Sequence, residues 1–315
     1  MNLKVGIVGL PNVGKSTLFN ALLGRQVAEA ANYPFCTIDP NVGVVEVPDE
    51  RLAKLVQVAQ SAKVIPAAIE FVDIAGLVAG AHKGEGLGNK FLAHIREVDL
   101  IVHVLRAFND DNVARAGSTD PLSDYKLILT ELELADLQTK EKHEKKKTNE
   151  IHNLHFLVDK PAIAVLNVSE DSLKSYPHFE IPLETIVISA RIESELSSLA
   201  PKDRRLYLEE LGLKESGLEK LIKVAYQKLG LISFLTAGPK EARAWTIKQG
   251  YKAPQAAGVI HTDFEKHFIK AKVCSFEDFV EHKGWKGLSD AGKLRLEGKE
   301  YIMQEGDVCE FVVGV

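Results

Sequence analysis

A short stretch near the N-terminus has the residue types and the spacing that hold a polyphosphate. Residues 9–16, GLPNVGKS, fit the pattern Gly-x-x-x-x-Gly-Lys-Ser/Thr at every position. In such a loop the glycines allow a tight turn with inward N–H groups, Lys15 reaches the outer phosphates, and the Ser16 hydroxyl takes one position around Mg²⁺. The sequence therefore predicts a site for a magnesium-bound nucleoside triphosphate.

Two later stretches offer residues that would complete the magnesium and phosphate contacts. Thr37, in YPFCTIDPN, is a candidate to close on Mg²⁺ and the γ-phosphate from a loop after the first helix. The apolar run EFVDIAG ends in Asp73-x-x-Gly76, where Asp73 would hold the magnesium shell and the Gly76 N–H would contact the γ-phosphate. The glycine-rich stretch LVAGAHKGEGLGN follows, and we interpret it as a segment that switches between order and disorder.

The residue that would orient the attacking water is not evident. Leu77 follows Gly76, at the position where many GTPases carry a glutamine, and an apolar side chain cannot hold water. Asn12 is a candidate ligand for K⁺ beside the phosphates, with a purely conformational role in the loop as the alternative. His82, in the glycine-rich segment, is a candidate for a residue that takes part in hydrolysis, and a solvated surface histidine is its alternative.

The stretch NVSE, residues 167–170, stands where purine-nucleotide switches carry Asn-Lys-x-Asp. In guanine-binding proteins that Asp accepts hydrogen bonds from the base and the Lys stem covers the ring. Here Val168 and Glu170 replace them, which removes about 1–3 kcal/mol of preference for guanine, while Asn167 can still reach N7 of either purine. ISAR, with Ser189 and Ala190, is where a second base-contacting loop is expected.

These motifs lie between apolar runs that alternate with amphipathic segments. The runs include KVGIVGL, VGVVEV, AAIEFVDIAG, DLIVHVL, PAIAVLNV and TIVISA. The alternation predicts an α/β domain over residues 1–230, with a doubly wound, mainly parallel sheet of the P-loop NTPase type. Short strands and turns from Leu231 onward predict a second, small α+β domain over residues 231–315.

A helical pattern from Ser123 to about Leu157 interrupts the first domain and predicts a helical insertion over residues 123–160. It contains the lysine-rich stretch 138–150, QTKEKHEKKKTNE. A solvated helical face explains these charges, and a contact with ribosomal or other RNA is the alternative.

Composition excludes several classes of protein. A formal net charge of -5 gives no bulk attraction to nucleic acid or to an anionic membrane. No run approaches the roughly 18 apolar residues of a membrane span, so no membrane partner is expected. The three cysteines, Cys36, Cys274 and Cys309, are far apart, which argues against a disulfide framework and fits the reducing cytoplasm.

Taken together, the stretches GLPNVGKSTLFNAL, DIAGLVAGAHKGEGLGNKFL, NVSE and FLTAGPKEARAWTIKQGYKAPQ resemble the YchF, or Obg-like ATPase, subfamily of P-loop NTPases. The resemblance implies an Obg-type nucleotide-binding domain followed by a TGS domain with a ubiquitin-like β-grasp fold. It also implies use of ATP in preference to or alongside GTP, slow hydrolysis, and association with the 50S or 70S ribosome or its RNA. We expect a monomer.

Site residues are carried over from the resemblance by position. Those expected to bind phosphates are Asn12, Val13, Gly14, Lys15, Ser16 and Thr17, with Ser16 and Thr37 on Mg²⁺ and Asn167 and Val168 on the base.

Two departures from the family pattern stand out. Relatives insert a long antiparallel helical arm, whereas only about 30 residues, from Glu131 to Lys160, are available here, enough for a hairpin of roughly 22 Å. Some relatives carry a histidine implicated in hydrolysis in the loop after HVL. In this chain Arg115 stands at the matching position and, although it could stabilise charge, it is a poor base.

Three functions remain open from the sequence. The first is a nucleotide-switched ATPase that acts on the ribosome in translation or stress regulation. The second is a GTPase with relaxed base choice. The third is a ribosome- or RNA-binding module in which the nucleotide fixes a conformation with negligible turnover.

Overall fold

The computed structural model describes residues 3–24, 41–74, 87–110, 120–145 and 156–314. Its first sheet has the strand order β2-β4-β1-β5-β6-β7, in which only β2 runs antiparallel to its neighbour. The strands are β1 (Lys4–Val8), β2 (Val42–Glu46), β4 (Ala68–Asp73), β5 (Leu100–Arg106), β6 (Ala162–Asn167) and β7 (Thr185–Ile188). The predicted doubly wound, mainly parallel sheet is therefore confirmed.

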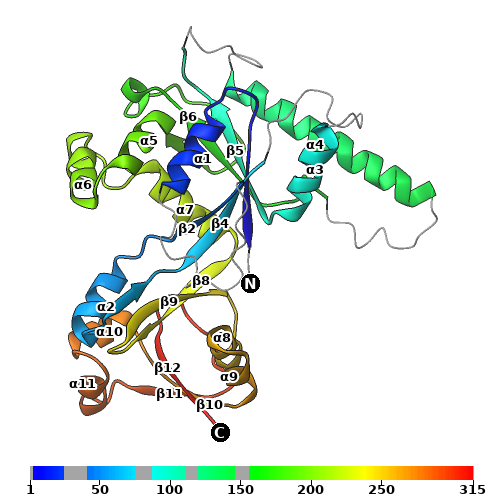
Figure 1. Ribbon diagram of the computed structural model, residues 1–315. Helices are drawn as coiled ribbons and strands as arrows, with labels where there is room; N and C mark the ends of the chain where they lie inside the picture. The colour runs from blue at the N-terminus through cyan, green and yellow to red at the C-terminus, as the bar shows by residue number, and fades with distance from the viewer. Residues whose placement is uncertain (1–2, 25–40, 75–86, 111–119, 146–155, 315) are drawn as a thin grey trace.

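Helices cover both faces of this sheet, as Figure 1 shows, with α1 and α5 on one side and α3 and α4 on the other. A strand that is covered on both faces is apolar along nearly its whole length. The strand β5 is an example, since all seven of its residues are buried. The helices in the first 230 residues are α1 (Lys15–Leu23), α2 (Arg51–Ala59), α3 (Leu87–Glu97), α4 (Pro121–Lys145), α5 (Ala190–Ser198), α6 (Pro201–Glu210) and α7 (Gly217–Lys228). Of these, α2 lies beside the second sheet.

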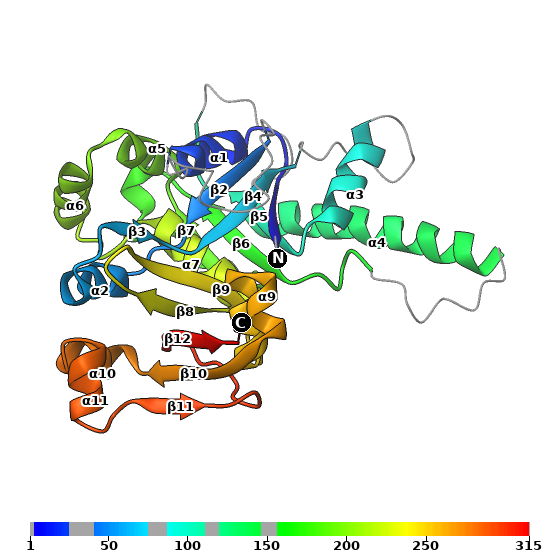
Figure 2. The same cartoon turned by 60° about the horizontal axis from the view of Figure 1, so that its bottom comes forward.

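The second sheet has the order β11-β10-β12-β8-β9-β3, which Figure 2 shows as a ladder. Its strands are β3 (Lys63–Ile65), β8 (Leu231–Ala237), β9 (Glu241–Lys248), β10 (Phe268–Cys274), β11 (Arg295–Glu297) and β12 (Val308–Val313). Helices α8 (Ala253–Ile260), α9 (Thr262–Lys266), α10 (Phe276–Glu281) and α11 (Trp285–Asp290) connect them. Without β3, this part begins with a hairpin of β8 and β9, continues with a crossing helix, and has β8 and β12 as a central parallel pair. This is the β-grasp order that the resemblance implies.

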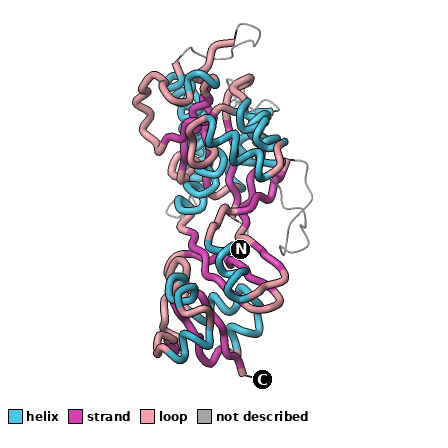
Figure 3. The backbone as a smooth tube through the Cα atoms, turned by 90° about the vertical axis from the view of Figure 1, so that its left-hand side faces the viewer, coloured by secondary structure: helices cyan, strands magenta, loops and turns pink. Residues whose placement is uncertain are grey.

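Strand β3 belongs to the first part of the chain but adds an edge to the second sheet. It pairs in parallel with β9, Ile65 opposite Arg243. The buried core is also continuous, since Leu55 and Ile69 share one hydrophobic cluster with Leu235 and Phe279. Figure 3 shows the two parts stacked lengthwise, with the C-terminus at the far end. A boundary at Gly230 stays a prediction.

Within the predicted insertion, residues 123–160, the structure describes one long helix and a returning stretch. Residues 146–155 lie outside the described residues, so the predicted hairpin stays a prediction. Helix α4 has 25 residues, or about 37 Å, and Phe156–Lys160 returns to the sheet without helical structure. The Asp136 carboxylate explains this return, because its Oδ2 accepts hydrogen bonds from the N–H groups of Leu157 and Val158, at 2.8 and 3.1 Å. The side chain of Leu157 is buried in the main core.

Two of the cysteines lie within the part of the chain that the structure describes. Cys274 and Cys309 are buried free thiols on the neighbouring strands β10 and β12. Burial raises the pKa of the Cys274 thiol to about 12 and that of Cys309 well above its ordinary value, so both are inert structural residues. Among the described helices, none has the length and apolar character that crossing a membrane requires.

Candidate nucleotide-binding site

A pocket of about 790 Å³ lies at the carboxyl ends of four neighbouring strands. Residues of segments 10–17, 108–110, 167–171 and 189–191, which follow β1, β5, β6 and β7, line it. In open parallel sheets, ligands bind at this edge because the loops there converge. The pocket thus brings the predicted phosphate loop, NVSE and ISAR together.

The backbone of the phosphate loop is held in a conformation that depends on glycine. Asn12 and Gly14 both have positive φ, 61° and 93°. A Cβ atom on Gly14 would lie 2.2 Å from Nδ2 of Asn167, so no larger residue fits there. Helix α1 begins at Lys15 and directs its N-terminal N–H groups toward the pocket edge, which favours an anion.

Lys15 and Asp73 form an ion pair in this structure. Asp73 is the last residue of β4 and stands beside Ile7 of β1, so the ends of two adjacent strands bring the two side chains together. Their side chains are 11% and 19% exposed, and Ser16 and Thr17 are exposed at the pocket. The hydroxyl of Ser16 and the carboxylate of Asp73 are the hard oxygen donors that Mg²⁺ prefers, so these residues fit the ion.

Asn167 ties the phosphate loop to the base loops. It is 4% exposed; its Nδ2 donates to the carbonyl of Val13, and its Oδ1 accepts from the N–H of Ala190, both at 2.9 Å. One N–H of the carboxamide remains for a base, so the predicted contact with N7 is compatible with this geometry. The side chain of Val13 is buried, so any contact of this residue with a phosphate would be made by its main chain.

The two residues that replace the guanine-selecting pair have different surroundings. Val168 is 2% exposed and packs in an apolar cluster with Leu105 and Tyr125. The Glu170 carboxylate lies 3.1 Å from Nε of Arg191, the second residue of α5, the helix that follows Ser189. These base contacts therefore stay predictions.

The structure adds a segment to the pocket that sequence reasoning missed. Phe108, Asn109 and Asp110 follow β5 and lie between the phosphate loop and the base loops in strand order. The sequence does contain a signal, because HVLRAFND places an arginine at the end of a buried strand, at the ligand-binding edge, and an aromatic residue two positions later.

Several predicted site residues lie outside the described residues. They are Thr37, Gly76, His82 and Arg115. Their expected roles in magnesium binding and hydrolysis stay predictions.

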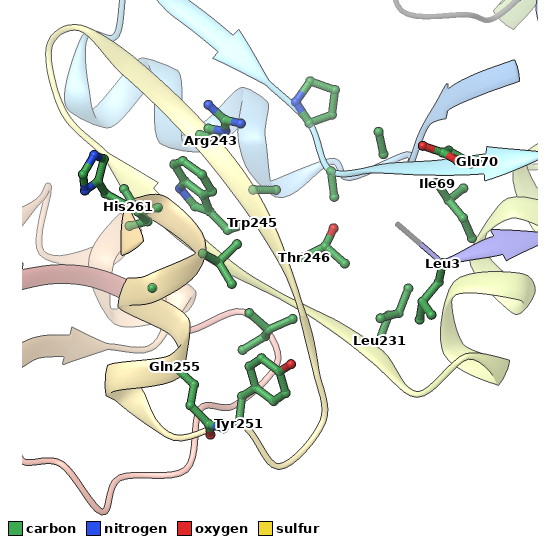
Figure 4. A pocket seen from close by; sticks show the side chains of 18 of the residues that line it. Leu3, Ile69, Glu70, Leu231, Arg243, Trp245, Thr246, Tyr251, Gln255 and His261 are labelled. Atoms are coloured by element: carbon green, nitrogen blue, oxygen red, sulfur yellow. The ribbon is translucent and has the colours of Figure 1, made fainter. Parts of the chain in front are cut away.

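A second cavity, of about 610 Å³, lies where the two sheets meet. Figure 4 shows Ile69 and Glu70 of β4 across from Trp245 and Thr246 of β9. The Arg243 guanidinium stacks on the Trp245 ring at 3.8 Å, and burial raises the pKa of Glu70. No residue of the predicted phosphate or base loops lines it, so nucleotide chemistry belongs to the first pocket.

Comparison with known families matches both parts of the chain. The family model described as 50S ribosome-binding GTPase matches residues 4–168. A second model, for the C-terminal part of YchF GTPases and described as a protein of unknown function, matches residues 231–313.

Curated relatives match along the whole chain. Ribosome-binding ATPase YchF from Bacillus subtilis is 48% identical and covers 99% of each chain, and YchF from Escherichia coli O157:H7 is 44% identical over all of both. Obg-like ATPase 1 from Pongo abelii is 42% identical and covers 98% of this chain and 92% of its own. The first alignment spans 364 residues, which exceeds the 315 of this chain, so part of that relative has no counterpart here.

Among solved structures, the Schizosaccharomyces pombe YchF GTPase superposes with a TM-score of 0.86 at 35% identity. The superposition covers 99% of this chain and 98% of the other. This likeness extends over both sheets and confirms the predicted P-loop α/β fold with an additional C-terminal domain.

Proposed function

Because this chain belongs to the family of YchF and Obg-like ATPases, we propose that it binds ATP with Mg²⁺ and hydrolyses it slowly, with GTP as a second substrate. The observation that carries the proposal is the pocket in which the phosphate loop, Asn167 and the Ser189–Ala190 turn meet. Separate stretches of sequence thereby supply phosphate, magnesium and base contacts at one edge of a sheet.

The residues at the phosphate end bind and orient the triphosphate. Inward N–H groups of residues 12–17 and the ammonium of Lys15 compensate the negative charge of the phosphates. Ser16 and Asp73 would hold Mg²⁺, together with Thr37, and the bound ion would neutralise charge on the transferred phosphoryl group. Asn12 is the proposed K⁺ ligand, and Gly76, His82 and Arg115 are the proposed contributors to hydrolysis.

The residues at the base end support the use of ATP. The Glu170 carboxylate is engaged by Arg191 at 3.1 Å and does not need to face the base edge. Adenine has an unprotonated N1 that would repel a fixed carboxylate, whereas guanine gains from one. When the carboxylate binds Arg191 instead of the base, it neither repels adenine N1 nor accepts hydrogen bonds from guanine. The preference for guanine is therefore lost.

The partner we propose is the ribosome, through the 50S subunit, the 70S particle or ribosomal RNA. The relatives from Bacillus subtilis and Escherichia coli are named ribosome-binding. On this proposal the chain acts as a cytoplasmic, monomeric switch in translation or stress regulation, and the C-terminal part is a TGS domain.

Phosphate release by purified protein, with and without 70S ribosomes, tests the proposal. We expect Mg²⁺-dependent release from ATP that rises on addition of ribosomes, and competition by GTP at a higher concentration than ATP. Lys15→Ala should abolish nucleotide binding, while Lys220→Ala, on the exposed face of α7, should leave it unchanged. Binding of ATP without any turnover, even on ribosomes, would favour a binding module instead.

A further inference from the structure

Two buried polar side chains stand next to each other at the ligand-binding edge of the first sheet. Arg106 and Asn167 are the last residues of β5 and β6, lie opposite each other in the parallel register, and are 3% and 4% exposed. Asn167 holds two loops of the nucleotide pocket through its carboxamide. Its neighbour Arg106 is directed at the third.

The guanidinium of Arg106 contacts the segment after β5 at three points. Its Nε donates to the carbonyl of Phe108 at 3.2 Å, and its Nη2 donates to the carbonyl of Asp110 at 3.3 Å. The guanidinium also lies 4.4 Å from the centroid of the Phe108 ring. One planar group thus fixes the backbone at two points and the aromatic ring at a third.

The segment held in this way is a wall of the nucleotide pocket. Phe108, Asn109 and Asp110 line the cavity between the phosphate loop and segment 167–171. Burying a guanidinium costs free energy unless its donors are satisfied, so the contacts also favour one conformation of the segment. An ordered wall lowers the cost of arranging the pocket when a nucleotide binds.

We infer that Arg106 is a positioning residue for nucleotide binding, which fixes residues 108–110 as the wall of the pocket between the phosphate loop and the base loops. The inference rests on the proposed function, because it assigns a role within that nucleotide site. It implies that Arg106 affects binding of the nucleoside part of the ligand and leaves the phosphate loop unaffected.

Arg106→Lys tests the inference, because lysine keeps the charge and loses the planar fork. Calorimetric titration should show at least tenfold weaker binding of ATP with Mg²⁺, and an affinity for inorganic tripolyphosphate with Mg²⁺ within twofold of wild type. In the protein without nucleotide, amide hydrogen exchange of residues 107–110 should accelerate.

A matched control exists elsewhere in the chain. Arg204 also donates to two backbone carbonyls, those of Leu196 and Leu199, at 3.0 and 3.3 Å, away from the pocket. Arg204→Lys should leave the affinity for ATP unchanged.

Three results would overturn the inference: unchanged ATP affinity in Arg106→Lys, an equal loss for ATP and tripolyphosphate, or unchanged exchange of residues 107–110. Failure of the wild-type protein to bind ATP is a different outcome, and it would refute the proposed function itself.

Discussion

At the scale of single residues, the contact between Lys15 and Asp73 places the phosphate-binding ammonium against a carboxylate. A triphosphate must compete with that carboxylate for Lys15 unless Mg²⁺ takes the carboxylate. Asp73→Asn should therefore strengthen ATP binding in EDTA by about fivefold, because it releases a partly buried pair. The same change should reduce Mg²⁺-dependent hydrolysis at least tenfold, because one proposed magnesium ligand is lost.

Fluorescence titration with a labelled ATP analogue, with EDTA and with Mg²⁺, measures the change in binding, and phosphate release measures the change in hydrolysis. Asp99→Asn is the control, since Asp99 binds the N–H of Lys4 at the opposite end of β1 from the phosphate loop. Unchanged affinity of Asp73→Asn in EDTA would mean that the pair does not compete with the nucleotide.

His103 gives a second prediction at this scale, for the dependence of stability on pH. It lies inside β5 with its ring edge-on to Tyr125, and its Nδ1 has no hydrogen-bond partner among the described residues. Burial lowers its pKa from 6.5 to about 4. Below pH 6.5 the imidazole is protonated in the unfolded chain, whereas in the native state it stays neutral down to about pH 4. The contribution of His103 to the free energy of unfolding is complete above pH 6.5 and decreases by about 3 kcal/mol as pH falls to 4.

Urea unfolding of His103→Leu between pH 4.5 and 7.5 measures this contribution. The variant should show a smaller loss of unfolding free energy on acidification than the wild type. His178→Gln, at an exposed position, should keep the wild-type slope. Equal slopes for wild type and His103→Leu would show that His103 is not buried in its neutral form.

At the scale of elements, sequence reasoning located what is encoded locally. The phosphate loop follows from glycines and a lysine within one turn, and NVSE and ISAR lie at strand ends that apolar runs mark. Sequence reasoning could not predict β3, because three residues, KVI, carry no strand pattern and their partners Glu241–Arg243 lie far along the chain. It also missed Arg106, because the role of a buried arginine depends on which loop its guanidinium meets.

The insertion shows how one side chain holds a returning stretch of chain. Asp136 of α4 accepts two hydrogen bonds from the returning chain and so fixes residues 157 and 158 against this helix. Asp136→Ala should lower the free energy of unfolding by about 1–3 kcal/mol, because two N–H groups lose their acceptor in a mostly buried place.

Urea unfolding followed by circular dichroism measures that loss. Glu141→Ala, on an exposed position of the same helix, controls for the change in helix propensity and should be nearly neutral. Equal stability of the two variants would show that the returning chain does not depend on Asp136.

At the scale of the whole molecule, the two parts are joined by more than the chain connection from α7 to β8. The Arg51 guanidinium of α2 contacts Glu305 at 2.5 Å, and the Ser61 hydroxyl donates to the carbonyl of Gly238 at 2.7 Å. From β3 the chain runs directly into β4, whose last residue, Asp73, meets Lys15 in the nucleotide site. A single short stretch thus belongs to the second sheet at one end and to the nucleotide site at the other.

This continuity predicts that both parts unfold together. Ile65 is 4% exposed at the junction, whereas its neighbour Val64, on the other face of β3, is 46% exposed. Ile65→Asp would bury an unpaired carboxylate at a cost of several kcal/mol, while Val64→Asp places the same charge in water. Calorimetry should show one transition for the wild type and for Val64→Asp, and two for Ile65→Asp.

ATP with Mg²⁺ tests the same coupling, because a ligand stabilises the unit that binds it. It should raise the temperature of the single transition in the wild type, and the temperature of only one of the two transitions in Ile65→Asp. Two independent transitions in the wild type would mean that the shared strand does not couple the nucleotide site to the C-terminal part.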